Sequence, residues 1–345
     1  MDETEAALEQ VRRTWDWLMG SVALSATNLG IELGLFEALS QLGPLRPSSL
    51  AAVLGLQQRP VETWARVLVR ERLLDVVDGD RVGLAPGTKL LVCEPRTLFN
   101  LAPSIAFHAR FLARDFADLP AYFEDGNVRS PARHGPGLVA NVAAQTAAMH
   151  AVFVAAILPT LAGVQAALGA GATVLDAGCG TGGLGLLLAE TFPGVVYTGI
   201  DMDPVAVASG HERLGRSPFG DRVTLIAADL AEGAGEPVHD VALLFQVLHE
   251  IAPGAREAVM SSVARALRPG GYLVLFDEFY PPTLADAQDD AARMGVHWEY
   301  CEMLWGSRVA TREETEALVL GAGFVDVEWM PVLEGSMTVL VARAV

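Results

Sequence analysis

Apolar residues recur at helical spacing along the first forty residues. They predict one helix over about residues 5–17 and a second over 22–39. Gly20 falls between the two ranges, and glycine weakens a helix interior. The first segment of the chain is therefore expected to hold two consecutive helices.

A different pattern covers residues 46–85. Hydroxyl residues at Ser48 and Ser49 are typical of a helix start, and Pro60 opens a second apolar-periodic stretch. Two short strand-like runs follow, at 74–77 and 81–84, joined by an Asp-Gly-Asp sequence that favours a tight turn. Helix, helix and hairpin in this order predict a winged helix.

Strands and helices alternate after Gly171. Residues 98–171 are mostly helical in pattern, whereas short apolar runs separated by helical stretches follow. Such alternation predicts an α/β fold with a doubly wound parallel sheet, and two last runs are close enough to pair as an antiparallel edge. The expected strands are 173–177, 195–200, 223–227, 241–246, 272–276, 324–329 and 337–342.

Composition limits the classes of partner. Of the 345 residues 51% are apolar, and 42 acidic residues against 24 basic ones give a net charge of −18. A field of this sign repels nucleic acid and anionic lipid, so neither is expected as a partner. The three cysteines are too few and too far apart for a zinc cluster, and they fit a reducing compartment. No apolar run approaches the ~18 residues of a membrane span, and the N-terminus is acidic where a signal peptide would be basic. These features predict a cytoplasmic protein.

A glycine-rich segment follows the first expected strand. Gly178, Gly180 and Gly183 have G-x-G-x-x-G spacing, which also occurs in dinucleotide-binding proteins, so an NAD-dependent oxidoreductase is one alternative. Glycines here allow a sharp turn and bring backbone N–H groups against a ligand at a helix start. Asp176 disfavours a pyrophosphate, because its carboxylate would repel phosphate and attract an ammonium or sulfonium group.

Two further acids end the next expected strands. Asp201 lies 23 residues beyond Gly178, where a carboxylate can accept hydrogen bonds from both hydroxyls of a ribose. Asp229 ends the third expected strand and can meet an adenine amino group. With Asp176, these acids predict one ligand crevice at the carboxyl edge of the sheet.

These motifs resemble those of the class I S-adenosylmethionine-dependent methyltransferases, specifically the small-molecule O-methyltransferase-like group. The resemblance also includes the segments Phe245-Gln246-Val247-Leu248-His249-Glu250 and Leu267-Arg268-Pro269-Gly270-Gly271, and in the N-terminal half Gly34-Leu35-Phe36. It implies a Rossmann-like seven-stranded C-terminal sheet and S-adenosyl-L-methionine as the cofactor. The cofactor contacts implied are Asp176, Gly178, Cys179, Gly180, Gly182, Asp201, Met202, Asp229, Leu230 and Gln246.

The same resemblance implies a division of the chain and a partner. Residues 1–95 would form a winged-helix dimerisation domain, 96–165 a helical linker with the substrate pocket, and 166–345 the cofactor-binding domain. The expected partners are a small-molecule substrate and a second copy of the chain. Apolar positions on more than one face of residues 12–40 also favour a homodimer.

His249 is the expected catalytic residue. In the resembling O-methyltransferases a histidine after the fourth strand takes the acceptor's hydroxyl proton, and its pKa near 6.5 suits that task. Here Glu250 follows, where the family usually has Asp-Trp. Related alpha-keto acid C-methyltransferases bind a metal with a comparable adjacent pair, a histidine and an acid, and with a later histidine. In this chain the resemblance places Glu302, rather than His297, at the position of that later histidine. We expect Glu250 or Glu302 to orient His249, and no metal; metal-assisted C-methylation is the alternative.

Aromatic and thioether side chains are candidates for the acceptor pocket, since they suit a flat apolar ligand and can face a sulfonium. His134, His211 and His239 are expected at the surface.

A winged-helix regulator that senses a ligand is a non-enzyme hypothesis. It is disfavoured because residues 44–93 carry a surplus of only two basic residues, which is small for a DNA-binding surface. A protein that binds the methyl donor without methylating is a further hypothesis. The candidate substrate-binding residues are Phe107, Phe111, Met149, Phe153, His297, Tyr300, Met303 and Trp305.

Overall fold

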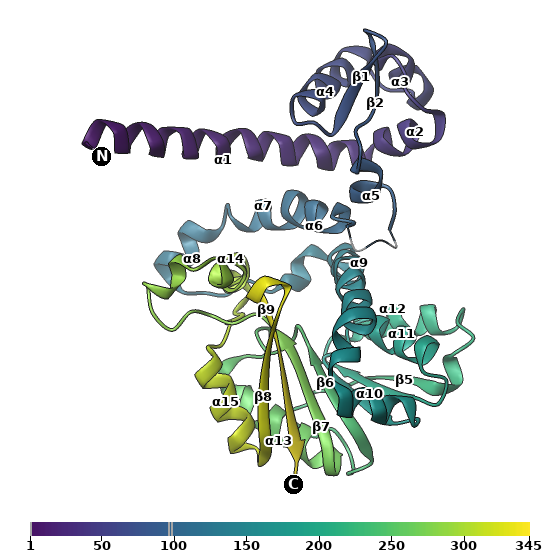
Figure 1. Cartoon of the computed structure of the whole chain (residues 1–345), viewed down its shortest axis with the longest axis vertical. Helices are drawn as coiled ribbons and strands as arrows, with labels where there is room; N and C mark the ends of the chain where they lie inside the picture. Colours follow the sequence, from purple (N-terminus) through teal and green to yellow (C-terminus); the bar gives the residue numbers. More distant parts are fainter. Residues whose placement is uncertain (1, 96, 98) are drawn as a thin grey trace. The chain divides into compact units, whose positions relative to one another are not determined.

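The computed structural model describes residues 2–95, 97 and 99–345 (Figure 1). The chain forms two compact units, of which the first ends at Arg114 and the second begins at Asp115. The expected middle region, 96–165, therefore falls across the boundary between the units. Each unit has hydrophobic core clusters of its own.

The first unit begins with one long helix, α1 (Glu3–Glu32). Two helices were predicted here, and that prediction was wrong, because α1 runs through Gly20 without a break. A single interior glycine costs only about 1 kcal/mol relative to alanine, which a 30-residue helix tolerates. Asp2 caps its start in a reciprocal pair of hydrogen bonds with Glu5. The helix ends before Gly34, whose φ of +69° suits glycine.

The predicted winged helix is confirmed. Its core centres on Leu50, Trp64 and Leu68, all buried. The ring nitrogen of Trp64 donates a hydrogen bond to the carbonyl of Ala26 at 2.9 Å, which ties this module to α1. Its elements are α2 (Leu35–Leu42), α3 (Pro47–Leu54), α4 (Gln58–Arg70) and the antiparallel strands β1 (Leu74–Val77) and β2 (Arg81–Leu84). Shorter helices α5 (Thr88–Val92) and α6 (Ala102–Ala106) follow.

The second unit opens with helices that a buried acid holds together. Asp115 is fully buried and accepts hydrogen bonds from Arg133 and from the ring nitrogen of Trp305, the latter at 2.8 Å. His134 lies 2.9 Å from the same carboxylate with its side chain only 5% exposed, so the prediction that it lies at the surface was wrong. The helices here are α8 (Leu119–Asp125), α9 (Pro136–Val152) and α10 (Ala162–Gly169).

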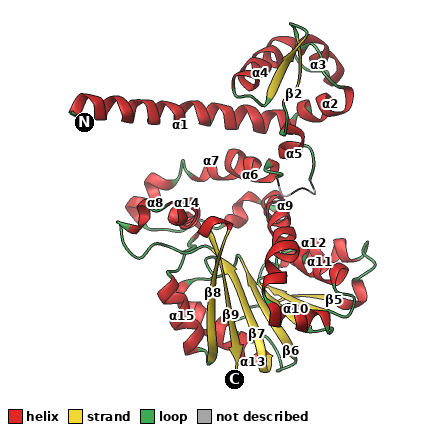
Figure 2. Cartoon of the chain, in the orientation of Figure 1, coloured by secondary structure: helices red, strands yellow, loops and turns green. Residues whose placement is uncertain are grey.

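A seven-stranded sheet forms the centre of the second unit, which confirms the predicted fold class (Figure 2). Its strand order is β5-β4-β3-β6-β7-β9-β8; the first five strands are parallel, and β9 is antiparallel to both β7 and β8. The strands are β3 (Thr173–Ala177), β4 (Val196–Asp201), β5 (Val223–Ala227), β6 (His239–Phe245), β7 (Leu267–Asp277), β8 (Phe324–Val332) and β9 (Met337–Ala344). His239 is buried at the start of β6, which corrects its predicted surface position.

Helices cover both faces of this sheet (Figure 1). One core cluster joins the sheet to α10, α11 (Gly183–Thr191) and α12 (Pro204–Leu214) through residues such as Leu168 and Leu188. A second cluster joins the other face to α13 (Arg256–Ala266) and α15 (Arg312–Gly321) through residues such as Val263 and Val319. The short helix α14 (Arg293–Glu302) follows β7. Because helices cover both faces of the sheet, the loops that carry the predicted site lie at the carboxyl edge of the parallel strands.

One helical stretch, Pro136–Thr160, is long and apolar enough by length and composition to cross a membrane. The bent pair α1 and α2 meets the same test only if both are counted as one span. The sequence expectation that no stretch approaches this length is corrected accordingly. Such helices are weak evidence for a span, since core helices of globular proteins have the same character.

Candidate functional site

The glycine loop between β3 and α11 has a backbone that other residues rarely adopt. Gly178 has a φ of +84°, and a Cβ atom added there would lie 2.2 Å from the side chain of Val247. Gly182 has a φ of +69°, and its Cβ would lie 2.7 Å from Leu225. Conformation and close packing therefore both require glycine at these two positions.

Asp201 holds the glycine loop against the second strand. Its Oδ2 accepts a hydrogen bond from the backbone N–H of Gly180 at 2.7 Å, and its Oδ1 accepts one from Asp203 at 2.8 Å. Burial raises the pKa of this carboxyl, and the two backbone hydrogen bonds act in the opposite direction. The carboxylate thus lies directly beside the loop, where a ribose bound against the loop could reach it.

Asp176 lies deeper than its neighbours. Its Oδ2 accepts a hydrogen bond from the hydroxyl of Tyr197 on β4, and the residue is 2% exposed. Burial raises the pKa of Asp176 to about 7, partly offset by the Tyr197 hydrogen bond. Within the part of the chain that the structure describes, its Oδ1 has no hydrogen-bond partner. A cationic group beside the loop would favour the ionised form of this acid.

The remaining predicted cofactor residues gather at the same edge of the sheet. Asp229 is exposed just beyond β5 and accepts a hydrogen bond from the backbone of Ala231 at 2.8 Å. Gln246 follows β6 with a φ of +51° and donates its backbone N–H to Phe276 at 2.7 Å. Strands β3, β4 and β5 are neighbours, so Asp176, Asp201 and Asp229 follow the edge in order. Cys179 and Leu230 are buried in this region, whereas Met202 is 77% exposed.

His249 lies just beyond β6 and is paired with an acid from β7. Its Nδ1 is 2.7 Å from Oδ1 of Asp277, and both side chains are buried. Oδ2 of Asp277 accepts a hydrogen bond from the backbone N–H of Leu248 at 3.0 Å, which fixes the carboxylate. The imidazole is therefore oriented through Nδ1, and Nε2 is left on its other side.

Two more buried carboxyls surround His249. Oε1 of Glu278 lies 3.6 Å from Nδ1, and Oε2 of Glu302 lies 3.7 Å from Nε2. Burial by itself lowers the pKa of His249, but Asp277, Glu278 and Glu302 together raise it well above its ordinary value. Burial also raises the pKa of Glu278 to about 8. Imidazole and carboxyls thus form one electrostatic unit that can hold or release protons.

Sequence reasoning found part of this unit. The structure brings together His249 and Glu302, as the resemblance implied, whereas Glu250 is exposed beside them. Asp277 and Glu278 were missed, although they directly follow an apolar strand, which is the signal that singled out Asp201 and Asp229. The residue that contacts the imidazole most closely is Asp277, rather than either of the expected partners.

The candidate substrate residues are dispersed. Phe107 and Phe111 belong to a π-helical turn of the first unit, Phe107–Leu112. In the second unit, Phe153 is fully buried against Phe245 and Phe276, with ring centroids 5.3 and 6.0 Å away, and Met149 packs on the same core. His297 and Tyr300 are exposed on α14, while Met303 and Trp305 are half-buried in the turn after it. Their contact with an acceptor stays a prediction.

Comparison with known proteins gives the class. Residues 175–273 match the family described as a methyltransferase domain. An uncharacterized methyltransferase of Synechocystis is 30% identical over 178 residues, which are 52% of this chain and 78% of that protein. Carboxy-S-adenosyl-L-methionine synthase of Chromohalobacter salexigens is 34% identical over 123 residues, 35% of this chain. The chain spans only 44% of the length of that second relative.

Solved structures share the fold over the whole chain. PigF with SAH superposes with a TM-score of 0.78 at 20% identity, covering 99% of this chain and 100% of that one. The mitomycin 7-O-methyltransferase superposes with a TM-score of 0.76 at 22% identity and the same coverage. The chain belongs to the class I S-adenosylmethionine-dependent methyltransferases, and its cofactor is S-adenosyl-L-methionine.

Proposed function

We propose that this protein transfers the methyl group of S-adenosyl-L-methionine to a hydroxyl group of a small molecule in secondary metabolism. The observation that carries the proposal is the position of the His249–Asp277 pair beside the crevice that Asp176, Asp201 and Asp229 define. The mitomycin 7-O-methyltransferase shares its fold with this chain, which supports the class of enzyme but does not identify the acceptor.

The chain's own residues would divide the work in three parts. The glycine loop and Asp201 would hold the donor, because backbone N–H groups and a carboxylate can bind its amino-acid and ribose parts. The buried surroundings of His249 would exclude water from the reacting atoms. The imidazole, oriented by Asp277, would first pass its Nε2 proton to Glu302, whose Oε2 lies 3.7 Å away. It would then take the acceptor's hydroxyl proton at Nε2, while the hydroxyl oxygen takes the methyl group and the donor's sulfur keeps the electron pair of the broken bond.

The test is a methyl-transfer assay with isotopically labelled donor. Purified protein would be incubated with panels of phenols, alpha-keto acids and amines, and the products read by mass. We expect a mass gain of one labelled methyl group on a hydroxyl-bearing acceptor. Labelled products confined to amines, or binding of S-adenosylhomocysteine without any product, would contradict the proposed acceptor class.

Methylation at an enolised carbon of an alpha-keto acid is a second candidate. The specific observation in its favour is the excess of carboxyls around His249, three acids against one imidazole. Such a site repels a free anionic substrate unless a cation lies between them. The keto-acid arm of the assay, run with and without added divalent ions, separates this candidate from the first.

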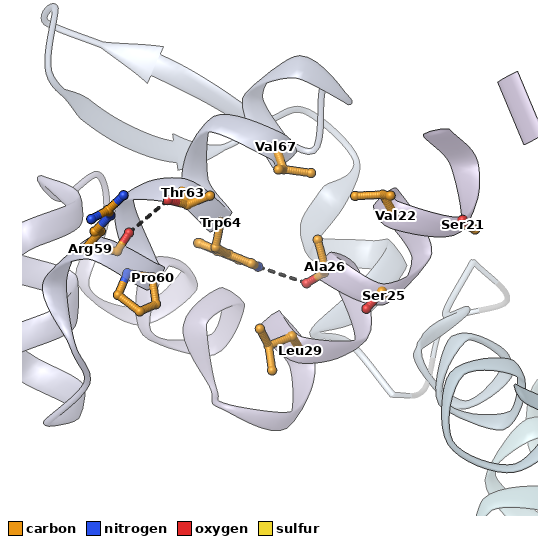
Figure 3. A pocket seen from close by; sticks show the side chains of 10 residues that line it. All are labelled: Ser21, Val22, Ser25, Ala26, Leu29, Arg59, Pro60, Thr63, Trp64 and Val67. Carbon is orange, nitrogen blue, oxygen red and sulfur yellow. Dashed lines mark hydrogen bonds between the residues drawn. The ribbon is translucent and has the colours of Figure 1, made fainter. Parts of the chain in front are cut away.

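We also propose that two copies of the chain associate through the first unit. A groove of about 700 Å³ lies between α1 and α4, with Ala26, Pro60, Trp64 and Val67 among its lining residues (Figure 3). Exposed apolar residues on α1 run toward this groove. The first five lie at alternating spacings of three and four, the seam spacing of paired helices, and the sixth lies seven positions after the fifth. They are Leu8, Val11, Trp15, Leu18, Val22 and Leu29.

That stripe supports a second copy as the occupant, because a helix with this pattern can pack against its own counterpart. Val22 and Leu29 belong both to the stripe and to the lining of the groove, so the stripe and the groove form one continuous apolar surface.

We also propose that the protein lies in the cytoplasm, in keeping with the free thiols of Cys93, Cys179 and Cys301.

A further inference from the structure

We propose that His249, Asp277 and Glu278 form a binding site for a divalent cation of the first transition series. The proposed function enters at one point only: the methyl acceptor, placed beside these residues, is what the cation would act on. The site itself depends on the side chains alone.

The first observation is the geometry of the ligand atoms. One nitrogen of His249 and one oxygen each from Asp277 and Glu278 lie within 4.8 Å of one another, and all three residues are buried. Asp277 ends β7 and Glu278 follows it, while His249 lies in the turn after the adjacent parallel strand β6. A cation between them would be in reach of all three after small shifts of the side chains. Glu302 lies at Nε2, on the opposite side of the imidazole, and is not one of these ligands.

The second observation is a buried oxygen without a partner. Glu278 is 3% exposed, and throughout the described residues nothing donates a hydrogen bond to its Oε2. Its other oxygen, Oε1, faces His249 at 3.6 Å, so the carboxyl group points into the cluster. A buried carboxylate oxygen ordinarily has a donor or a cation beside it. Glu278 is therefore built for a ligand that the protein chain does not itself provide.

Charge favours the same conclusion. Asp277, Glu278 and Glu302 bring three carboxyls to a single imidazole, so a protonated His249 compensates for only one of them. Neither lysine nor arginine pairs with these three carboxyls in the described part of the chain. Buried charges without partners are strongly unfavourable, and a divalent cation would compensate for two at once.

The ligand atoms indicate the kind of ion. Imidazole nitrogen suits zinc, iron, copper and nickel, whereas carboxylate oxygen suits manganese, magnesium and calcium. A set of one nitrogen and two oxygens fits manganese or iron(II), which accept both. The orientation of Asp277 is already secured, since it accepts hydrogen bonds from the backbone of Leu248 and Glu278 at 3.0 and 3.1 Å. Such outer contacts commonly orient the ligands of protein metal sites.

A bound cation would change the role of His249. An imidazole that binds a cation through Nδ1 cannot keep a proton at that nitrogen, and the nearby positive charge makes its Nε2 a weaker proton acceptor. The cation would instead lower the pKa of an acceptor oxygen that it contacts, which prepares that oxygen or a neighbouring carbon for methylation. An acceptor with two adjacent oxygen atoms, such as an enolised alpha-keto acid or a vicinal diol, would fit best.

The test uses Mn²⁺ as the probe, because its electron paramagnetic resonance signal distinguishes free from bound ion. Protein stripped with EDTA would be titrated with Mn²⁺ near neutral pH. We expect one bound ion per chain, binding at least ten-fold weaker in Glu278→Gln, and unchanged binding in Glu257→Gln, a control at an exposed acid on α13. His249→Gln provides a second variant should Glu278→Gln fail to fold.

The outcomes separate this inference from the proposed function. Absence of stoichiometric Mn²⁺ binding, or equal binding by Glu278→Gln and the unaltered protein, would overturn the cation site. Methyl transfer that persists in EDTA would then leave the proposed function standing. Conversely, tight Mn²⁺ binding lost in Glu278→Gln would uphold the site even if no hydroxyl acceptor were methylated.

Discussion

The Nδ1 atom of His249, in the turn after β6, lies 2.7 Å from Oδ1 of Asp277, the last residue of the adjacent strand β7. Phe245 and Phe276 are paired in register at the ends of β6 and β7, so the segments that follow them leave the sheet at the same edge. The sheet thus places the acid, and the hydrogen bond from the backbone N–H of Leu248 to Asp277 ties the turn that carries the imidazole to it. A fixed partner of this kind holds a histidine in one orientation.

Replacing His249 by alanine tests its role in turnover. We expect kcat to fall by about 10²–10⁴-fold, the usual contribution of a proton-transfer group, while the dissociation constant for S-adenosylhomocysteine stays nearly the same. Steady-state kinetics and calorimetry measure the two quantities. His211→Ala is the matched control, because His211 is exposed on α12. Near-normal turnover in His249→Ala would mean that the acceptor reacts by proximity alone.

Replacing Asp201 by alanine tests the cofactor crevice. Each charge-assisted hydrogen bond to a ribose hydroxyl contributes about 1.5–3 kcal/mol, and the variant also loses the contact to Gly180 that holds the loop. We expect binding of S-adenosylhomocysteine, measured by calorimetry, to weaken at least ten-fold. Asp221→Ala, at an exposed acid before β5, should bind as the unaltered protein does. Equal binding by both variants would remove Asp201 from the site.

The sheet and the winged helix could be predicted from the sequence because their signals are local. Apolar runs such as 173–177 and 223–227 became strands with the predicted bounds. The continuity of α1 could not be predicted, since one glycine gives a local signal for a break that the rest of the helix outweighs.

The residues that surround His249 could be identified in full only from the tertiary structure. Sequence placed His249 and Glu302 near each other only through a family resemblance, and it missed Asp277 because acids at strand ends were sought only where a nucleotide would bind. His134 was expected at the surface for a related reason. Its burial depends on Asp115, which lies 19 residues away and gives no local signal.

The buried acid Asp176 should make stability depend on pH. Its pKa is about 7 in the folded protein against an ordinary value of 3.8, so the folded state binds more protons than the unfolded state between these values. The free energy of unfolding should therefore decrease as pH rises from about 4 to 7. In Asp176→Asn this part of the slope should be absent, as measured by urea unfolding at several pH values. Parallel curves for both proteins would show that Asp176 ionises normally.

The apolar stripe on α1 should decide the oligomeric state. Trp15 and Leu18 are 60% and 50% exposed within one chain, and glutamate at both positions would place charges in the proposed interface. We expect light scattering at micromolar concentration to give a dimer mass for the unaltered protein and a monomer mass for Trp15→Glu/Leu18→Glu. Thr14→Glu, at an exposed polar position on the same helix, should remain dimeric. A monomer mass for the unaltered protein would refute the proposed association.

A methyl group at Gly178 should weaken both the fold and cofactor binding. Alanine there would adopt a φ of +84°, which costs about 1–2 kcal/mol, and its Cβ would lie 2.2 Å from Val247. Overpacking adds about 1–3 kcal/mol, unless the segment after β6 moves and carries His249 with it. We expect a lower Tm and at least ten-fold weaker binding of S-adenosylhomocysteine. Gly254→Ala is the control, since its added Cβ would meet no atom within 4 Å. If Gly178→Ala bound the ligand as tightly as Gly254→Ala does, the loop would not form the cofactor site.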